Sequence, residues 1–229
     1  MPESGVAGDS RMAQNGATMG APLPNLSLER FSRRLAVALE EPLAPEAAEK
    51  LFSHYEELRR WNARLSLVGP GTTDQAVELH YAESLAGRSL IGSRDRVLVD
   101  LGSGAGFPGV PLAAGLPDLE VWLVEPRSRK WAFLRSAVAA ADLRCRCLDT
   151  RLTGDLQADF PSAIDVVTVR ALKLEPETWD AIGQRLSRRG RILSWGVEEV
   201  PEGLAGWRVG RRVRLPGRER WILELKVPA

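Results

Sequence analysis

The sequence predicts an α/β protein with a mainly parallel seven-stranded sheet, a C-terminal antiparallel hairpin and an N-terminal helical cap. From residue 97 onward, short β-rich runs alternate with helical segments, which is typical of βαβ units and a parallel sheet. The first of these runs ends in a glycine-rich turn. The last two runs are joined only by Leu215-Pro216-Gly217, which leaves no room for a helix and predicts antiparallel pairing.

The composition is that of a globular protein. The 229 residues include 31 Lys+Arg against 30 Asp+Glu, and 44% are hydrophobic, which excludes a disordered or collagen-like chain. We expect no membrane span and no signal peptide, because the sequence has no long apolar run and no apolar segment near its start. Two cysteines and no signal fit a cytoplasmic protein. The formal charge of +1 gives no overall reason to expect a nucleic-acid binder.

Three segments are expected along the chain. Residues 1–25 are rich in small residues without periodicity and predict a disordered tail. Residues 26–92 predict the helical cap, and residues 93–229 predict the α/β domain. Within the cap, apolar residues recur at helical spacing in three segments: 28–39, 45–62 and 74–85.

The α/β domain divides into strands and helices by the same patterns. The predicted strands are 97–101, 121–125, 144–148, 164–169, 191–195, 207–213 and 220–227. The predicted helices between them are 110–114, 129–141 and 176–186. Cys145 and Cys147 fall in the third strand and are expected to be small core residues, because no Cys/His spacing indicates a metal site.

The segment VDLGSGAGFPG, residues 99–109, is the strongest local signal. A strand, a glycine turn and a helix bring backbone N–H groups close to a ligand, and glycine is required where a Cβ would block the approach. Glu125 ends the next strand, at the position where a carboxylate meets ribose hydroxyls in such folds. Asp100 would repel a pyrophosphate but suits the ammonium end of an amino-acid cofactor. The turn therefore favours S-adenosylmethionine over a nicotinamide dinucleotide, although the spacing of Gly104, Gly106 and Gly109 fits both.

Residues from about 50 to 227 resemble the ribosomal RNA small subunit methyltransferase G family, also called GidB. The most specific motif is the extension of the glycine turn, Gly-Phe-Pro-Gly-Val-Pro at residues 106–111. Further elements similar to the family are Trp61-Asn62, His80 with Glu83-Ser84, Lys130 with Phe133-Leu134, Arg151, and Val169-Arg170-Ala171.

The resemblance implies the class I Rossmann-like methyltransferase fold and S-adenosylmethionine-dependent methylation of guanine N7 in 16S ribosomal RNA. Its implied partner is 16S ribosomal RNA or the 30S subunit, with no metal, and a monomer is favoured. N7 carries a lone pair and no proton, so its methylation needs placement rather than a general base. His80 and Arg170 are the candidates for substrate positioning. The expected cofactor-binding residues are Asp100, Gly102, Gly104, Phe107, Glu125, Leu152, Thr153 and Arg170.

The chain departs from the family pattern in regions expected to meet the substrate. These departures are Ser66, Val68, Leu79 and Trp195, and Glu83 stands where the family has Asp in the His80 element. A divergent family member with another substrate therefore stays open, as does a non-catalytic nucleotide- or RNA-binding module.

Several other residues have simpler interpretations. Arg170 could instead form a strand-end salt bridge with Asp100 or Glu125. His54 is expected to be packed or solvated. The residues Trp61, Trp131 and Trp179 lie at helical positions and are expected in the core.

Basic residues gather in three clusters despite the near-zero total charge. Such patches can contact phosphates without a basic total. The cluster after the second strand ranks first as an RNA contact, because it lies at the carboxyl ends of the strands. The clusters are Arg127, Arg129, Lys130 and Arg135; Arg185, Arg188, Arg189 and Arg191; and Arg208, Arg211, Arg212, Arg214, Arg218 and Arg220.

Overall fold

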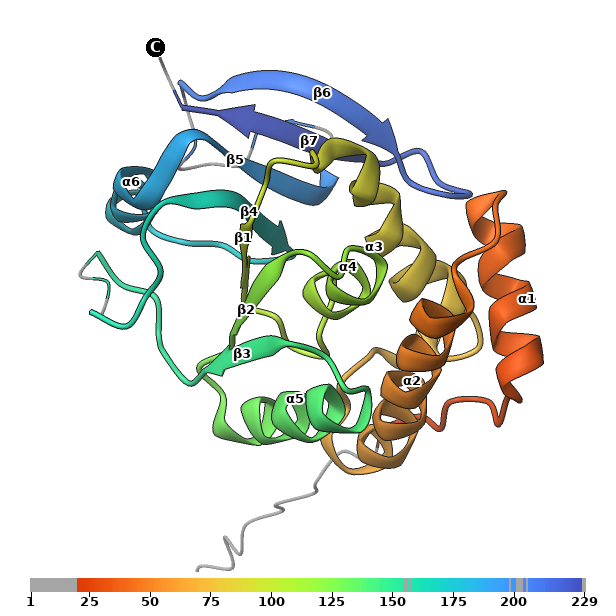
Figure 1. Ribbon diagram of the computed structural model, residues 1–229. Helices are drawn as coiled ribbons and strands as arrows, with labels where there is room; N and C mark the ends of the chain where they lie inside the picture. The colour runs from red at the N-terminus through yellow and green to blue at the C-terminus, as the bar shows by residue number, and fades with distance from the viewer. Residues whose placement is uncertain are drawn as a thin grey trace, which may run out of the picture.

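A seven-stranded sheet runs through the middle of the molecule, with helices on both faces (Figure 1). The computed structural model describes residues 20–154, 156, 158–197, 199–200, 204 and 206–227. The strands are β1 (Val97–Leu101), β2 (Glu120–Val124), β3 (Cys145–Leu148), β4 (Ile164–Arg170), β5 (Leu186–Val197), β6 (Arg208–Arg214) and β7 (Trp221–Lys226). The helices are α1 (Leu28–Leu39), α2 (Pro45–Leu65), α3 (Glu83–Leu85), α4 (Gly109–Gly115), α5 (Ser128–Ala140) and α6 (Pro176–Arg185).

The strand order is β3-β2-β1-β4-β5-β7-β6. Strands β1 to β5 pair in parallel, whereas β7 pairs antiparallel with both β5 and β6. The predicted mainly parallel sheet with a C-terminal hairpin is therefore confirmed. Strand β5 begins at Leu186, earlier than predicted, because Leu186 pairs with Ile164 before a bulge interrupts the register.

The cap forms from helices with recognisable ends. The Ser27 hydroxyl caps α1 by accepting a hydrogen bond from the Arg30 N–H at 3.3 Å, and Pro45 occupies the first turn of α2, where a missing donor costs nothing. The third predicted helix is more irregular than its periodicity indicated. A π-helical turn (Val77–Ala82) leads into α3, and a 3-10 helix (Ala86–Leu90) follows.

Residues 20–25 lie along α2, although the sequence placed them in the tail. The Gly20 N–H donates to the Ala63 carbonyl at 3.2 Å, and the Tyr55 hydroxyl donates to the Pro24 carbonyl at 2.6 Å. Leu23 is buried at 4% exposure, so these residues complete the cap. The rest of the predicted tail, residues 1–19, lies outside the described residues.

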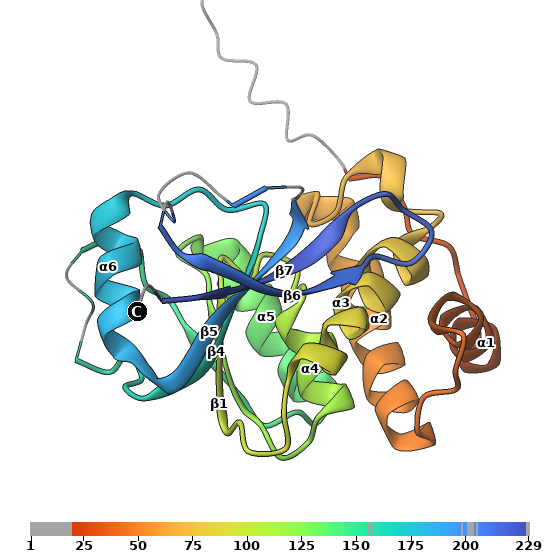
Figure 2. The same cartoon turned by 90° about the horizontal axis from the view of Figure 1, so that it is seen from above.

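Two apolar clusters cover the two faces of the sheet. One cluster joins the cap to α4, α5 and the sheet, and includes Phe31, Tyr55, Val110 and Leu193. The other contains Trp179 of α6. Figure 2 shows α6 on one side of the sheet and the cap helices on the other. The cap is thus a layer of the same core.

Among the remaining predicted core residues, Trp179 is fully buried, whereas the others are only partly buried: Trp61, Trp131, Cys145 and Cys147. Trp61 packs edge-on against Phe133, with ring centroids 6.1 Å apart. Cys145 and Cys147 are free thiols packed against the cap-side cluster. Trp131 is only half-buried, and its indole N–H donates to the Cys147 carbonyl at 3.1 Å. In the part of the chain that the structure describes, no helix is long and apolar enough to cross a membrane.

Candidate functional site

The glycine turn leaves the carboxyl end of β1 in a conformation that requires glycine. Gly102, Gly104 and Gly106 have φ of +69°, +57° and +89°, in the left-handed region that side chains disfavour. A Cβ at Gly106 would lie 2.8 Å from Val110 and 3.0 Å from Nε2 of His54. The turn is therefore closely backed at Gly106, whereas a Cβ at Gly104 would meet no atom closer than 3.7 Å.

Two carboxylates accept hydrogen bonds from backbone N–H groups of the turn. Glu125 Oε2 accepts the Gly104 N–H at 2.9 Å, while Asp100 Oδ2 accepts the Gly109 N–H at 3.2 Å. Asp100 Oδ1 also accepts the Thr168 hydroxyl at 2.7 Å. Asp100 is fully buried, and burial raises its pKa to about 6. Both predicted acids thus lie at the turn. Both oxygens of Asp100 accept hydrogen bonds that stabilise the conformation of the turn and its neighbouring strand.

His54 is a residue of this site whose role the sequence did not reveal. Its Nε2 lies 3.1 Å from the Ala105 carbonyl, and its Nδ1 lies 2.7 Å from the Tyr81 hydroxyl. A carbonyl only accepts, so Nε2 carries the proton and Nδ1 accepts from Tyr81. Burial lowers the pKa of His54 to about 4, which keeps the ring neutral at pH 7. A helix of the cap therefore supports the back of the glycine turn.

His80 and Phe107 lie together at the junction of the cap and the turn. Their rings are stacked, with centroids 5.0 Å apart and an interplanar angle of 24°. His80 Nε2 lies 3.0 Å from the Thr72 hydroxyl. Burial, together with the charges of Arg170 and Arg218, lowers the pKa of His80 to about 3. His80 is therefore a neutral ring that covers Phe107.

Arg170 forms its salt bridge with the cap. Its Nη2 lies 2.7 Å from Glu83 Oε2 and donates to the Leu79 carbonyl at 2.8 Å. Arg218, from the β6–β7 turn, reaches the other oxygen of Glu83 at 3.0 Å. The alternative prediction, a salt bridge to Asp100 or Glu125, is wrong. Both of those carboxylates are already occupied by the hydrogen bonds that shape the glycine turn.

A cavity of about 830 Å³ opens at the carboxyl ends of β4 and β5, beside the glycine turn. Leu172 lines it and also approaches the turn, because a Cβ on Gly102 would lie 3.2 Å from the Leu172 methyl groups. Its apolar lining includes Val169, Leu172, Leu174, Trp179, Trp195 and Leu215. Its charged lining includes Glu83, Arg170, Lys173, Arg218 and Arg220.

Leu152 and Thr153 follow β3, on the far side of β2 from β1. Leu152 is partly buried against the α6-side core, and Thr153 is exposed. Glu125 is tied to this region because its N–H donates to the Leu148 carbonyl at 3.1 Å. The predicted cofactor residues thus lie along the carboxyl ends of β1, β2 and β3, except Arg170, which ends β4 and is held by Glu83 of the cap.

The departures from the family pattern divide into two groups. Ser66 ends α2 in a left-handed conformation, and the N–H of the buried Val68 donates to Asn62 Oδ1 at 2.9 Å. Leu79 and Trp195 reach the site itself. Leu79 supplies the carbonyl that Arg170 binds, and the Trp195 indole donates to the Glu83 carbonyl at 2.9 Å.

In the basic cluster after β2, which was the first candidate for an RNA contact, only some of the side chains are exposed. Arg127 and Arg129 are exposed at the start of α5, whereas Lys130 is half-buried, and burial lowers its pKa. Arg135 lies over the Trp131 ring, 4.9 Å from its centroid.

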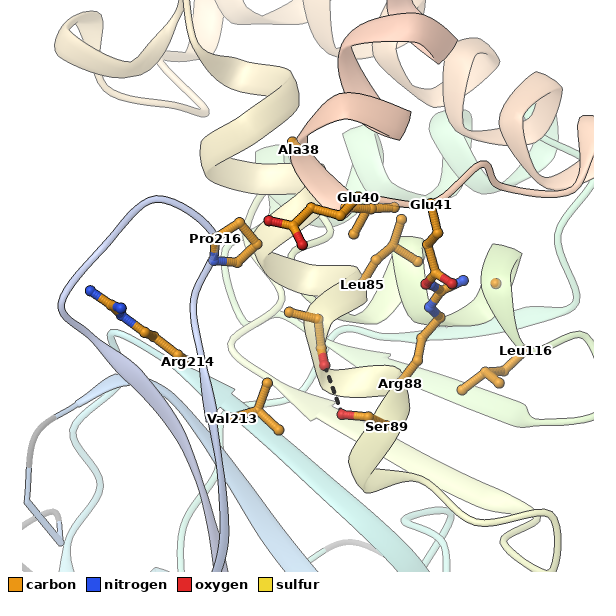
Figure 3. Close-up of a pocket in the computed structure, with 13 residues that line it drawn as sticks. Ala38, Glu40, Glu41, Leu85, Arg88, Ser89, Leu116, Val213, Arg214 and Pro216 are labelled. Atoms are coloured by element: carbon orange, nitrogen blue, oxygen red, sulfur yellow. Dashed lines mark hydrogen bonds and ion pairs between the residues drawn. The ribbon is translucent and has the colours of Figure 1, made fainter.

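A second hollow, of about 620 Å³, lies between the end of α1, the segment after α3 and the hairpin (Figure 3). Glu41 and Arg88 point toward one another across it and form an ion pair. Its walls include Leu85 of the cap, Leu116 at the end of α4 and Pro216 of the hairpin turn. None of its lining residues contacts the glycine turn, whereas Leu172 of the 830 Å³ cavity lies against Gly102, so we place the candidate site at that cavity.

Comparison with known proteins agrees with this geometry. The family described as GidB, rRNA small subunit methyltransferase G, matches residues 47–197. The ribosomal RNA small subunit methyltransferase G of Anaeromyxobacter sp. (strain Fw109-5) is 38% identical over 163 residues, which cover 71% of this chain and 74% of the relative. Its counterpart in Rhodopseudomonas palustris (strain BisA53) is 33% identical over 223 residues, or 93% of each chain.

Solved structures share the fold at low sequence identity. Mitomycin 7-O-methyltransferase MmcR superposes with a TM-score of 0.54 at 17% identity, covering 87% of this chain and 68% of that one. Precorrin-6y C5,15-methyltransferase from Geobacter metallireducens GS-15 superposes with a TM-score of 0.51 at 18% identity, covering 64% and 87%. The fold is therefore that of Rossmann-like methyltransferases, and the chain belongs to the rRNA small subunit methyltransferase G family.

Proposed function

We propose that this protein transfers the methyl group of S-adenosylmethionine to N7 of a guanosine in 16S ribosomal RNA. The observation that carries the proposal is the position of Leu172. This side chain lines the 830 Å³ cavity and also lies against the glycine turn. A cofactor site and a substrate pocket therefore share one wall, as group transfer between two bound molecules requires.

The residues at the glycine turn fit S-adenosylmethionine. The positive φ values favour backbone rather than side chains facing a ligand, and the Glu125 carboxylate at the end of β2, which accepts the Gly104 N–H, keeps further lone pairs that would accept from ribose hydroxyls. Gly102, Gly104, Glu125, Leu152 and Thr153 would hold the cofactor. When bound, S-adenosylmethionine supplies an electrophilic methyl group on a sulfonium.

The cavity suits a purine with its phosphate. Leu172, Trp179 and Trp195 provide apolar walls for a flat ring, while Lys173 and Arg220 are exposed at the lining and match phosphate oxygens. Arg170 is fixed by Glu83, which orients its guanidinium beside the cavity. These residues place the base, and no proton has to be removed from N7.

His80 fits this chemistry as a positioning group. With a pKa of about 3, it is neutral across the physiological range and a poor acid at pH 7. Its stacking on Phe107 fixes the junction between the cap and the turn. We expect His80 to align the two binding sites rather than to carry a proton.

Two alternatives stay open: a different methyl acceptor, which the departures at Leu79 and Trp195 favour, and a module that binds nucleotide or RNA without catalysis. The deciding experiment is mass spectrometry of rRNA nucleosides from a deletion strain. We expect loss of one 7-methylguanosine from 16S RNA, restored by the wild-type gene and not by Gly102→Arg.

An unchanged nucleoside profile would overturn the proposed substrate. Methyl transfer by the purified protein to another RNA would then identify a divergent member. Binding of 30S subunits without any transfer would identify the non-catalytic module. The monomeric state and cytoplasmic location stay predictions, which light scattering and cell fractionation would test.

A further inference from the structure

A basic hollow lies at the end of β5 opposite to the candidate site. Its volume is about 770 Å³, and it is formed by the start of β5, the start of β6 and the end of β7. The register places Arg191 and Arg208 each opposite Lys226. Arg191 and Trp195 lie four residues apart on β5, so roughly 13 Å of strand separates this hollow from the cavity.

The lining of the hollow is dominated by cations. Its basic residues are Arg188, Arg189, Arg191, Arg208, Arg211 and Lys226. Glu224 is the carboxylate among its lining residues, and it is 1% exposed. The surface that a ligand would meet is therefore positive.

Ion pairs beneath the hollow fix part of this lining. Arg191 Nη2 lies 2.6 Å from Asp95, and Arg211 Nη2 lies 2.8 Å from Glu224. Lys226 Nζ lies 3.1 Å from the other oxygen of Glu224. The floor is thus pre-arranged by charges that are already paired.

Three arginines on the rim have no such partner. In the described ranges, Arg188, Arg189 and Arg208 form no ion pair, and all three are exposed. The neighbouring carboxylate of Asp165 accepts hydrogen bonds from the Ser187 hydroxyl and the Arg96 N–H. Even with Asp95 and Asp165 included, six cations face three carboxylates.

We propose that this hollow binds the phosphodiester backbone of RNA as a second docking site, remote from the catalytic end. Guanidinium groups pair bidentately with phosphate, and several of them in an open hollow match a chain of phosphates better than one small anion. The identification of the polyanion as RNA rests on the proposed function.

Protection of an edge strand does not account for the feature. Arginines on an exposed edge such as β6 can prevent pairing with another chain. That explanation covers Arg208, but Arg188 and Arg189 lie in the irregular stretch of β5 between Leu186 and Arg191, where the pairing register with β4 is interrupted and no regular edge is offered. Cations from three strands therefore converge for a different reason.

The test compares two charge reversals of equal size in the full-length protein. Arg188→Glu with Arg208→Glu alters the hollow, and Arg30→Glu with Arg64→Glu alters exposed arginines of the cap. The probe is a fluorescently labelled transcript of 16S ribosomal RNA, titrated at several salt concentrations. Calorimetry with S-adenosylmethionine and thermal melts establish that both variants remain folded.

We expect the hollow variant to lose about tenfold or more in RNA affinity and about two units of salt slope, as for two lost phosphate contacts. Its KM for RNA should rise with kcat retained. Equal losses of RNA affinity in both variants would show that only net charge matters and would overturn the proposed docking site. Unchanged RNA binding in the hollow variant would overturn it as well. If wild-type protein binds RNA through the hollow but transfers no methyl group, the docking inference holds and the proposed function fails.

Discussion

Arg170 at the end of β4 and Glu83 in the cap form an ion pair of 2.7 Å, with Glu83 only 2% exposed at its side chain. Arg218 of the hairpin turn meets the same carboxylate. One buried acid therefore joins three segments that are far apart in sequence, at the wall of the cavity that we assign to the substrate.

Removing that charge should destabilise the protein. Glu83→Gln leaves two guanidinium groups without their carboxylate, and we expect a loss of about 2 kcal/mol in the free energy of unfolding, discounted because Arg218 is partly exposed. Urea denaturation would measure it. Glu83→Asp keeps the charge and should lose less than half as much free energy of unfolding as Glu83→Gln. A Gln variant as stable as wild type would contradict the role of the bridge.

Filling the glycine turn should abolish cofactor binding. Gly102 has φ of +69° and faces Leu172, so Gly102→Arg introduces backbone strain and occupies the space over the turn. Isothermal calorimetry should show no heat with S-adenosylmethionine. Gly71→Arg is the control, because a Cβ there meets nothing within 4 Å. Unchanged affinity in the Gly102 variant would show that the cofactor site lies elsewhere.

His54 should make stability depend on pH. Its pKa of about 4 in the folded protein lies below the unfolded value of 6.5, so the unfolded state binds the extra proton first. Its contribution is complete above about pH 6.5 and is lost as the pH falls toward 4. The stability difference between wild type and His54→Gln should therefore shift by about 2 kcal/mol between pH 7.5 and pH 5. Both proteins contain His80 and the other titrating groups, so the contributions of these groups cancel in the comparison. A stability difference that does not change with pH would exclude a buried neutral His54.

Gly87 should tolerate no side chain. A Cβ there would lie 2.4 Å from Cζ2 of the buried Trp195 ring. Gly87→Ala should cost about 2 kcal/mol through overpacking, measured by thermal or urea unfolding. Trp195→Phe should relieve the clash in the double variant, giving a clear interaction energy in a double-mutant cycle. Additive effects would show that the two residues do not press on one another.

The glycine turn, the strands and the C-terminal hairpin were predictable because they depend on local signals. Glycine spacing, β-rich runs and the short Leu215-Pro216-Gly217 link act over a few residues. The partners of His54 and Arg170 were not predictable in the same way. The hydrogen bond of His54 to Ala105 spans 51 residues, and that of Arg170 to Glu83 spans 87. The partner of Arg170 also depends on which nearby carboxylates already accept other hydrogen bonds.

The basic clusters show the same limit. Sequence proximity grouped Arg185 with Arg188, yet Arg185 donates to the Phe160 carbonyl while Arg188 is exposed in the hollow. A count of charges cannot separate structural arginines from free ones. The cluster after β2, which ranked first, is divided between exposed residues and the half-buried Lys130.

The cap shares one apolar cluster with α4, α5 and the sheet, and its His54 supports the glycine turn. Such a layer cannot swing aside as a lid, because opening would expose that whole cluster to water. A large RNA must therefore approach along the carboxyl edge of the sheet while the cap stays closed. Conformational adjustment for substrate entry would then fall to the loop after β4 and to the hairpin turn that carries Arg218.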